Sequence, residues 1–316
     1  MNAVFLDFAT MGSGLNVDAL RVTFPDIKFF TATTDEQIAE RIQDVEFVLG
    51  NKVRITREHL QDHPSVRYIG LTATGTDNID LVAAEEHGVA VCNIQAYCAS
   101  SVAEHVFGCL LTLTRNLEQY HAAVRRGEWQ ESKDFCLLSY PIRELAGMTL
   151  GIIGYGNLGQ SVARMGEAFG MKVIISSRSE AEIGEGRVAF EEVLRQSDVI
   201  SLHCPLNNAT RGLFGEAAFK LMKADAILVN TARGGLVDSS ALVAALETGQ
   251  IGAAAIDVLP TEPPIDGDPL LDYTGPNLII TPHVAWGSNE ARQAALDQLA
   301  ECVAAFNNGK EKNRVV

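Results

Sequence analysis

Residues 149–159 read TLGIIGYGNLG, and this stretch is the strongest indication of the fold. An apolar run leads straight into Gly154, Gly156 and Gly159, whose GxGxxG spacing is followed by a helix-like segment. The first glycine allows a tight turn, the second lets the backbone approach a pyrophosphate, and the third lets helix and strand pack closely. Phosphate then binds the free amides at the positive end of the helix. The strand and helix context favours a dinucleotide site over a glycine-rich turn without a ligand.

From Met148 onward, short apolar runs alternate with helix-like segments. This alternation predicts an α/β fold with a doubly wound parallel sheet of the Rossmann type. The six strands are expected near Leu150, Val173, Val199, Ile227, Ala254 and Ile279.

The first hundred residues alternate on a smaller scale, which predicts a flavodoxin-like α/β unit. Because 316 residues exceed the usual size of one hydrophobic core, we expect two domains. An amphipathic pattern over 295–306 is expected to return to the first unit. The substrate domain then comprises 1–98 and 286–316, and the dinucleotide-binding domain comprises 99–285. Strands of the smaller unit are expected at residues 4–6, 27–30, 47–49, 68–71 and 89–92.

A long helical pattern begins after the first unit. The serine pair ending at Ser101, with Glu104 placed for a capping box, opens a pattern that extends to Leu117 and is expected to cross between the domains. The polar stretch 125–139 contains Trp129 and lacks a clear period, which indicates an excursion over the surface or against another subunit. A homodimer is the expected assembly, because symmetric pairing is the commonest.

Composition limits the partners. A net charge of −15 and a pI near 4.9 would repel a phosphate backbone, and no Lys/Arg cluster forms a local exception, so nucleic acid is not an expected partner. No basic segment opens the chain and no stretch approaches about 18 apolar residues, so neither secretion nor membrane insertion is indicated. Six cysteines without CxxC spacing fit a reducing cytoplasm, and no metal site is expected.

The end of the second strand of the larger domain bears on the choice of cofactor. A carboxylate about 20 residues after the glycine motif would hold the ribose 2′-hydroxyl of NAD. Here Ser177 and Arg178 follow the strand, with no acid before Glu180. An arginine there removes the repulsion of a 2′-phosphate and supplies a cation to bind it, which favours NADP. The alternative is that Arg178 is a solvated surface residue and the site accepts both NAD and NADP.

Three polar residues follow later strands of the same domain, where ligands bind in open α/β sheets. Arg233 can grip a carboxylate with its planar guanidinium, His283 can exchange a proton near neutral pH, and Glu262 can orient another side chain. Each alone is as well explained as a structural or surface residue. Together they supply the anchor, the proton donor and the partner that reduction of a 2-keto acid requires.

The sequence resembles the D-isomer-specific 2-hydroxyacid dehydrogenases over essentially its whole length. The resemblance implies that Arg233 binds the substrate carboxylate, that His283 is the acid/base on the 2-oxygen, and that Glu262 favours protonated His283. It also implies that Asp257 contacts the nicotinamide end of the cofactor, that backbone amides around Thr74 and Gly75 hold the carboxylate from the other domain, and that the reaction takes place between the domains. The matching segments are GTDNID at 75–80, SVAEH at 101–105, the glycine motif, NTARGG at 230–235, DVLPTEP at 257–263 and Pro282-His283.

Within the family, the segments 93–101 and 283–286 look most like glycerate dehydrogenases, which implies reduction of hydroxypyruvate or glyoxylate. Another side chain, as in D-lactate or an aromatic or branched 2-keto acid, is the main alternative, and a dinucleotide-sensing corepressor is a further one. Glu262 argues against the formate dehydrogenase branch, and the lack of a cofactor acid and of a regulatory extension argues against phosphoglycerate dehydrogenases. Trp286 is expected to line the substrate site. Further cofactor contacts are expected from Asn157, Leu158, Cys204, Pro205, Thr210, Thr231 and Ala232.

Overall fold

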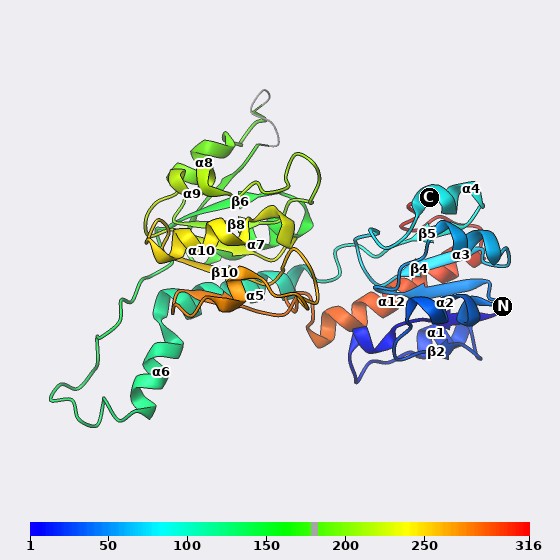
Figure 1. Cartoon of the computed structure of the whole chain (residues 1–316), viewed down its shortest axis with the longest axis horizontal. Coiled ribbons are helices and arrows are strands. Elements are labelled where there is room, and N and C mark those ends of the chain that lie inside the picture. The colour runs from blue at the N-terminus through cyan, green and yellow to red at the C-terminus, as the bar shows by residue number, and fades with distance from the viewer. Residues whose placement is uncertain (178–182) are drawn as a thin grey trace. The chain divides into compact units, whose positions relative to one another are not determined.

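The computed structural model describes residues 1–177 and 183–316. The chain divides into two compact units, which Figure 1 shows as two separate sheets with helices. Unit 1 comprises Met1–Cys98 and Gly287–Val316, and unit 2 comprises Ala99–Trp286. Trp286 thus groups with unit 2, whereas the sequence analysis placed it at the start of the returning segment.

Unit 1 is built on a five-stranded parallel sheet in the order β2-β1-β3-β4-β5, which is the flavodoxin-like order. Strands β1, β3, β4 and β5 are buried along their whole length, as strands covered on both faces must be. All five predicted runs form strands. Their bounds are β1 Ala3–Phe5, β2 Lys28–Phe29, β3 Phe47–Gly50, β4 Tyr68–Leu71 and β5 Ala90–Cys92.

Helices cover the sheet of unit 1 and enclose an aliphatic core that includes Ile38, Ile69 and Val91. The last helix of the chain, α12 (Asn289–Asn307), packs against α1 and β4, so the C-terminal segment completes this unit. Its first turn is capped by Ser288, whose hydroxyl accepts a hydrogen bond from the Ala291 amide at 3.1 Å. The other helices are η1 Phe8–Met11, α1 Asp18–Thr23, α2 Asp35–Ile42, α3 Arg57–Asp62 and α4 Leu81–Glu86.

Unit 2 contains a six-stranded parallel sheet in the order β11-β10-β9-β8-β6-β7. The chain leaves β6 toward β7 on one side and then continues from β8 on the other, so the topological switch point lies between β6 and β8. All six predicted strands are present, and the Rossmann-type prediction is confirmed. The bounds are β6 Thr149–Ile153, β7 Lys172–Ile175, β8 Val199–Leu202, β9 Ile227–Asn230, β10 Ala253–Ile256 and β11 Leu278–Ile280.

The first helix of unit 2, α5 (Ala99–Arg115), differs from its prediction in three ways. It ends at Arg115, because Asn116 adopts a left-handed conformation with φ 50° that breaks the helix before Leu117. It lies wholly within unit 2, so it does not cross between the units. It also begins two residues before Ser101, so the predicted capping box is wrong: the Ser101 hydroxyl instead donates to the Ala285 carbonyl at 2.7 Å.

The remaining helices of unit 2 connect the strands of the larger sheet. Helix α5 packs against α7, and the core between helices and sheet includes Val193, Leu228 and Ala254. None of the described helices is both long and apolar enough to span a membrane. The bounds are α6 Leu117–Arg125, α7 Asn157–Ala168, α8 Phe190–Gln196, α9 Glu216–Leu221, η2 Gly234–Leu236, α10 Ser239–Glu247 and α11 Pro269–Asp272.

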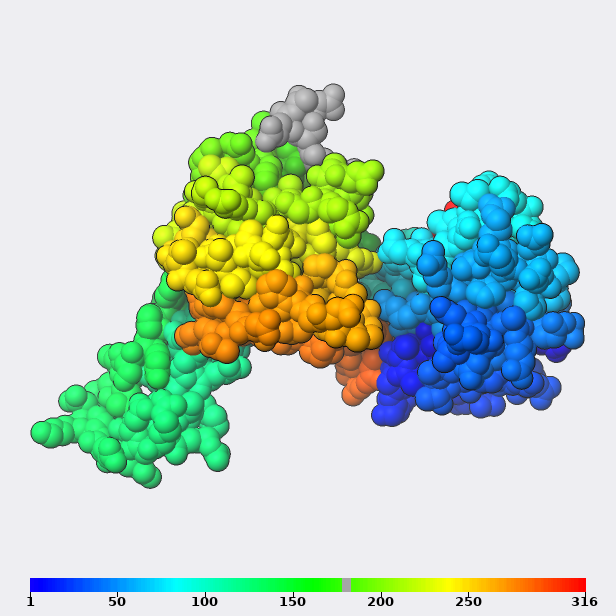
Figure 2. All heavy atoms as spheres, in the orientation of Figure 1, coloured from blue at the N-terminus to red at the C-terminus, as the bar shows by residue number. Residues whose placement is uncertain are grey.

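Residues 117–143, the arm, extend away from the body of unit 2 (Figures 1 and 2). The arm consists of α6 and the irregular segment that follows it. Its apolar side chains are unusually exposed for a folded protein, with 91% of Phe135 and 77% of Leu138 accessible. Trp129 is half exposed, and its indole donates to the Phe135 carbonyl at 3.0 Å, which ties the segment to itself.

Candidate active site

The glycine motif forms the turn between β6 and α7 at the topological switch point. Gly154 has a φ of 97°, and a Cβ atom there would lie 2.5 Å from the Cys204 amide nitrogen. A Cβ on Gly159 would lie 2.1 Å from the Gly154 carbonyl oxygen, so helix and strand approach too closely for a side chain. A Cβ on Gly156 would meet no atom within 4 Å, so the second glycine faces open space.

Helix α7 presents an uncapped N-terminus beside this open space. Its N-cap residue, Gly156, has no side chain to accept hydrogen bonds, so the first amides, those of Asn157, Leu158 and Gly159, have no intrahelical partner. The positive end of the helix dipole and these amides fit the pyrophosphate of a dinucleotide. A second feature fits the same ligand: the hydroxyl of Thr231, just after β9, is buried and has no hydrogen-bond partner among the described residues. Both would be satisfied by a bound dinucleotide.

The segment after β8 forms a closed loop next to the glycine turn. The Thr210 hydroxyl donates to the Pro205 carbonyl at 2.7 Å and accepts from the Asn207 amide at 2.8 Å. Burial raises the pKa of the Cys204 thiol, so at neutral pH this side chain is a protonated, weakly polar group. Burial also lowers the pKa of His203 to about 4, which keeps the imidazole neutral. The predicted cofactor residues of this loop therefore offer an uncharged surface.

The loop after β9 carries Arg233 and is shaped by a fully buried side chain, Asn230. The side-chain oxygen of Asn230, Oδ1, accepts a hydrogen bond from the backbone amide of Ala232 at 3.0 Å. Its side-chain nitrogen, Nδ2, donates to the Arg233 carbonyl at 3.0 Å. Arg233 is exposed, and its Nη1 donates to the Ala232 carbonyl at 2.7 Å. A guanidinium has five N–H groups, so this contact orients it while leaving donors for an anion.

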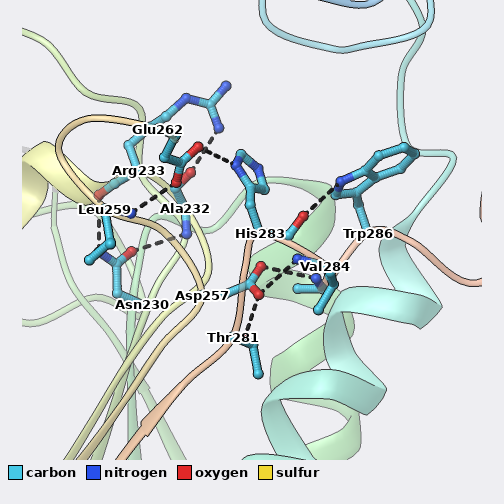
Figure 3. A network of polar contacts seen from close by, with 11 residues as sticks. Asn230, Ala232, Arg233, Asp257, Leu259, Glu262, Thr281, His283, Val284 and Trp286 are labelled. Atoms are coloured by element: carbon cyan, nitrogen blue, oxygen red, sulfur yellow. Dashed lines mark hydrogen bonds and ion pairs between the residues drawn. The ribbon is translucent and has the colours of Figure 1, made fainter. Parts of the chain in front are cut away.

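The loop after β10 carries Glu262, whose two carboxylate oxygens have different partners (Figure 3). Oε1 accepts from the Leu259 amide at 2.8 Å, which holds the carboxylate to its own loop. Oε2 lies 2.6 Å from His283 Nδ1, after β11. The contact is short enough for a charge-assisted hydrogen bond, and it leaves the opposite ring nitrogen, Nε2, to face other groups.

The loops after β9 and β10 touch, which brings the three predicted catalytic residues to one place. A Cβ on Gly234 would lie 1.9 Å from the Leu259 carbonyl carbon, so only glycine permits this approach. Arg233, Glu262 and His283 line one pocket of about 160 Å³. Its other lining residues are Leu206, Gly234, Gly235, Val258, Leu259 and Pro260. This volume is smaller than the roughly 300 Å³ and upward that larger ligands occupy, which suits a small molecule.

Trp286 and Thr74, which are also predicted site residues, are not among the residues that line this pocket. Trp286 donates from its indole nitrogen to the His283 carbonyl at 3.1 Å. Thr74 belongs to unit 1, where its hydroxyl donates to the Ile94 carbonyl at 2.9 Å and fixes the loop that also carries Gly75. Arg178 lies outside the described residues, and Ser177, which precedes it, pairs through its amide with the Val188 carbonyl at 2.8 Å.

The chain is similar to a known dehydrogenase over nearly its whole length. Residues 107–285 match the family described as "D-isomer specific 2-hydroxyacid dehydrogenase, NAD binding domain". The chain is 46% identical over 314 residues to a glycerate dehydrogenase of Methylorubrum extorquens, covering 99% of this chain and 98% of that protein. The chain belongs to the D-isomer-specific 2-hydroxyacid dehydrogenase family. It is therefore an NAD(P)-dependent oxidoreductase that transfers a hydride between the cofactor and the 2-carbon of a small 2-keto or 2-hydroxy acid.

Two solved structures of this fold are complexes with a nicotinamide dinucleotide. An acyclic imino acid reductase in complex with NADPH and D-Arg is 29% identical, with a TM-score of 0.85 and full coverage of both chains. A D-lactate dehydrogenase from Aquifex aeolicus complexed with NAD and lactic acid is 30% identical, with a TM-score of 0.83 over 100% of this chain and 99% of that one. The fold thus accommodates either nicotinamide dinucleotide, and side chains must decide between them.

The sequence did not indicate the residues that hold these loops in place through hydrogen bonds. Asn230 holds the Arg233 loop, while Thr281, His105 and Ser101 hold the segment after β11. The available signal was a polar residue at the end of an apolar strand, as at positions 230 and 281. Such a residue either faces a ligand or replaces lost strand hydrogen bonds, and sequence alone does not distinguish the two.

Proposed function

We propose that this family member reduces hydroxypyruvate or glyoxylate to the corresponding 2-hydroxy acid, with Arg233, Glu262 and His283 as its catalytic residues. The observation that carries the proposal is the 2.6 Å contact between His283 Nδ1 and Glu262 Oε2 in a pocket that Arg233 also lines. The glycerate dehydrogenase relative supports the substrate, because oxidation of glycerate at its 2-carbon yields hydroxypyruvate.

We assign each of these residues a task in the reaction. The nicotinamide cofactor supplies the hydride that the carbonyl carbon receives. The guanidinium of Arg233 grips the substrate carboxylate and so fixes which carbon faces the cofactor. His283 donates a proton from Nε2 to the 2-oxygen, because its Nδ1 is held by Glu262. The carboxylate of Glu262 favours the protonated imidazole and fixes the plane of the ring. In the oxidative direction His283 accepts the proton back.

Backbone and apolar groups complete the assignment. We place the pyrophosphate at the amides of Asn157, Leu158 and Gly159, and the nicotinamide end near Asp257 at the end of β10. Cys204, Pro205, Thr210, Thr231 and Ala232 are assigned to the walls of the cofactor site. In unit 1, the backbone around Thr74 and Gly75 is assigned to the substrate carboxylate, and Trp286 of unit 2 is assigned to the substrate site.

We propose NADP(H) as the favoured cofactor, with NAD(H) as the alternative. Ser177 follows β7 where a carboxylate would bind the ribose 2′-hydroxyl of NAD, and Arg178 supplies a cation for a 2′-phosphate. We further propose that the protein acts in the cytoplasm as a homodimer formed through the arm. The exposed apolar side chains of the arm, including Phe135 and Leu138, support pairing with a second copy.

A substrate panel tests the proposal directly. The purified protein is assayed with hydroxypyruvate, glyoxylate, pyruvate and phenylpyruvate, each with NADPH and with NADH. We expect the highest kcat/KM for hydroxypyruvate or glyoxylate with NADPH. A preference for pyruvate or phenylpyruvate would move the protein to another substrate. Binding of dinucleotide without reduction of any of the four acids would indicate a sensing role instead.

A further inference from the structure

A buried carboxylate organises the segment that carries His283. Asp257 is only 2% exposed and follows β10. Its Oδ1 accepts from the Thr281 hydroxyl at 2.6 Å and from the Val284 amide at 2.9 Å, and its Oδ2 accepts from the Ala285 amide at 2.9 Å (Figure 3). The carboxylate therefore binds the chain on both sides of His283, two residues before it and one and two residues after it.

The backbone of His283 needs such support. Its φ is 55°, in the left-handed region that costs a residue with a side chain about 1–2 kcal/mol. Its amide donates to the Asp257 carbonyl at 2.7 Å, and its carbonyl accepts from the Trp286 indole at 3.1 Å. The direction of the imidazole, and hence its contact with Glu262, follows from this fixed turn.

Helix α5 reaches the same segment at two points, one helical turn apart. His105 Nε2 lies 3.1 Å from the Thr281 hydroxyl and 3.8 Å from Asp257 Oδ1, and its side chain is 19% exposed. The Ser101 hydroxyl donates to the Ala285 carbonyl at 2.7 Å. Both ends of the turn around His283 are thus tied to a helix that carries no group of the proposed catalytic set.

The hydrogen positions in this chain of contacts follow from the donors available. A carboxylate accepts only, and a hydroxyl has a single hydrogen. The Thr281 hydrogen is given to Asp257 at 2.6 Å, so the Thr281 oxygen must accept from His105. Nε2 of His105 therefore carries a hydrogen, whether the ring is neutral or protonated. The side chain acts as a donor that no apolar residue replaces.

We propose that His105 is a positioning residue for His283, acting through Thr281 and Asp257 to hold the left-handed turn. The inference rests on the proposed role of His283 as acid/base. His105 has no place at the reacting atoms, so its loss should reduce the fraction of enzyme in which His283 is aligned, and leave ligand binding intact. A misalignment of about 1 Å costs up to about 100-fold in rate.

A matched pair of variants separates the hydrogen bond from the volume. His105→Met removes the donor, whereas His105→Gln has a similar shape and places an amide nitrogen near the position of Nε2. We expect His105→Met to lower kcat about tenfold or more, with the Kd for NADPH and the KM for the keto acid within about twofold. His105→Gln should recover kcat to within about threefold of the wild-type value.

The second link is tested at Thr281. Thr281→Val removes the hydroxyl with little change of shape, and Thr281→Ser keeps it. We expect Thr281→Val to lower kcat about as much as His105→Met does. Thr281→Ser should retain most of the wild-type kcat. Because both residues act on one carboxylate, the double variant His105→Met/Thr281→Val should be no worse than about twofold below either single one, which is strong non-additivity. If His105→Met does not fold, this Thr281 pair carries the test.

A readout independent of turnover comes from Trp286, which donates to the His283 carbonyl. The sequence has two tryptophans, so Trp129→Phe leaves Trp286 as the only tryptophan, whose emission is excited selectively at wavelengths that tyrosine does not absorb. In that background, His105→Met should shift or broaden the emission of Trp286 and lower its anisotropy, and His105→Gln should not. Unchanged emission in His105→Met would show that the turn does not depend on His105.

Failure of this inference is distinguishable from failure of the proposed function. His283→Ala is measured alongside: if it keeps kcat, the acid/base role is wrong, and the emission of Trp286 still decides whether His105 holds the turn. If His283→Ala is inactive and His105→Met keeps wild-type kcat, the positioning role is overturned. It is also overturned if Met and Gln lose kcat and NADPH affinity in parallel, because that indicates a general structural defect.

Discussion

His283 and Glu262 are separated by 21 positions in the sequence, and Nδ1 of the first lies 2.6 Å from Oε2 of the second. Neighbouring parallel strands bring them together, because Glu262 follows β10 and His283 follows β11. Both side chains are about one third exposed, so the pair is accessible to substrate and also open to solvent screening. The contact therefore contributes little to stability and mainly orients the imidazole.

Replacing Glu262 by glutamine tests that role. An amide preserves the shape but not the charge, so protonated His283 loses its favourable partner. Since the proposed reduction takes a proton from His283, we expect kcat/KM for the keto acid to fall about 10- to 100-fold in Glu262→Gln. Glu262→Asp, which keeps the charge on a shorter side chain, should retain more activity than Glu262→Gln. Steady-state kinetics with the keto acid compares the two variants, and a wild-type kcat/KM in Glu262→Gln would contradict the assignment.

Arg233→Ala removes the proposed carboxylate anchor. Because the guanidinium would form two parallel hydrogen bonds, we expect the KM for the keto acid to rise about 100-fold, with the Kd for NADPH nearly unchanged. Arg233→Lys keeps the positive charge but not the two parallel N–H groups, so its KM for the keto acid should lie between those of the wild-type and Ala proteins. Steady-state kinetics with cofactor titration distinguishes the effects. Equal KM values for the Ala and wild-type proteins would rule out the anchor.

Arg178→Ala tests the choice of cofactor. If this arginine binds the 2′-phosphate, its loss should weaken NADPH by about 10-fold or more, as expected for a charge-assisted contact, and leave NADH within about twofold. The Kd values are measured by titration for both dinucleotides. Arg187→Ala removes a different cation, whose Nη1 donates to the Ser176 carbonyl at 3.1 Å, and provides the control. Equal losses of affinity for NADPH and NADH would contradict the proposed role of Arg178.

His203 predicts a pH dependence of stability. Burial lowers its pKa to about 4 from an ordinary 6.5, so the unfolded chain binds a proton between these values and the folded protein does not. Stability from this group is complete above about pH 6.5 and is lost as the pH falls toward 4, by up to about 3 kcal/mol. His203→Gln keeps a polar atom near Ser201 and should show a shallower loss. Urea unfolding at several pH values in this range makes the comparison; parallel curves for the two proteins would refute it.

Charged substitutions in the arm should change the oligomeric state of the protein. Phe135→Glu combined with Leu138→Glu places two charges on side chains that are 91% and 77% exposed, so the fold of one copy should tolerate them. If the arm pairs with a second copy, charges at the contact should convert a dimer to a monomer at micromolar concentration. Sedimentation velocity measures the mass. Val22→Glu, an equally exposed position in unit 1, is the control and should leave the mass unchanged.

Local sequence patterns indicate the strands and the polar residues that follow them. Apolar runs bounded by turn residues located all eleven strands, because hydrophobic periodicity is a local property. The glycine spacing located the turn at the switch point, and the order of Arg233, Glu262 and His283 after successive strands located the candidate site. The sequence pattern does not indicate that the helix breaks at Asn116. The left-handed conformation of this residue depends on contacts outside the helix, such as the hydrogen bond from its side chain to the Pro141 carbonyl.

How these residues come into contact depends on the packing of the sheet and its loops. The register of β10 and β11 sets Glu262 beside His283, and the glycine at 234 lets two loops touch. The left-handed turn at His283 is held by Asp257, Thr281 and helix α5, whose contributions come from positions up to 184 residues apart. Side-chain hydrogen bonds over such separations depend on distances of a few tenths of an ångström. Sequence patterns do not encode those distances, because they arise only when the sheet and its covering helices are packed.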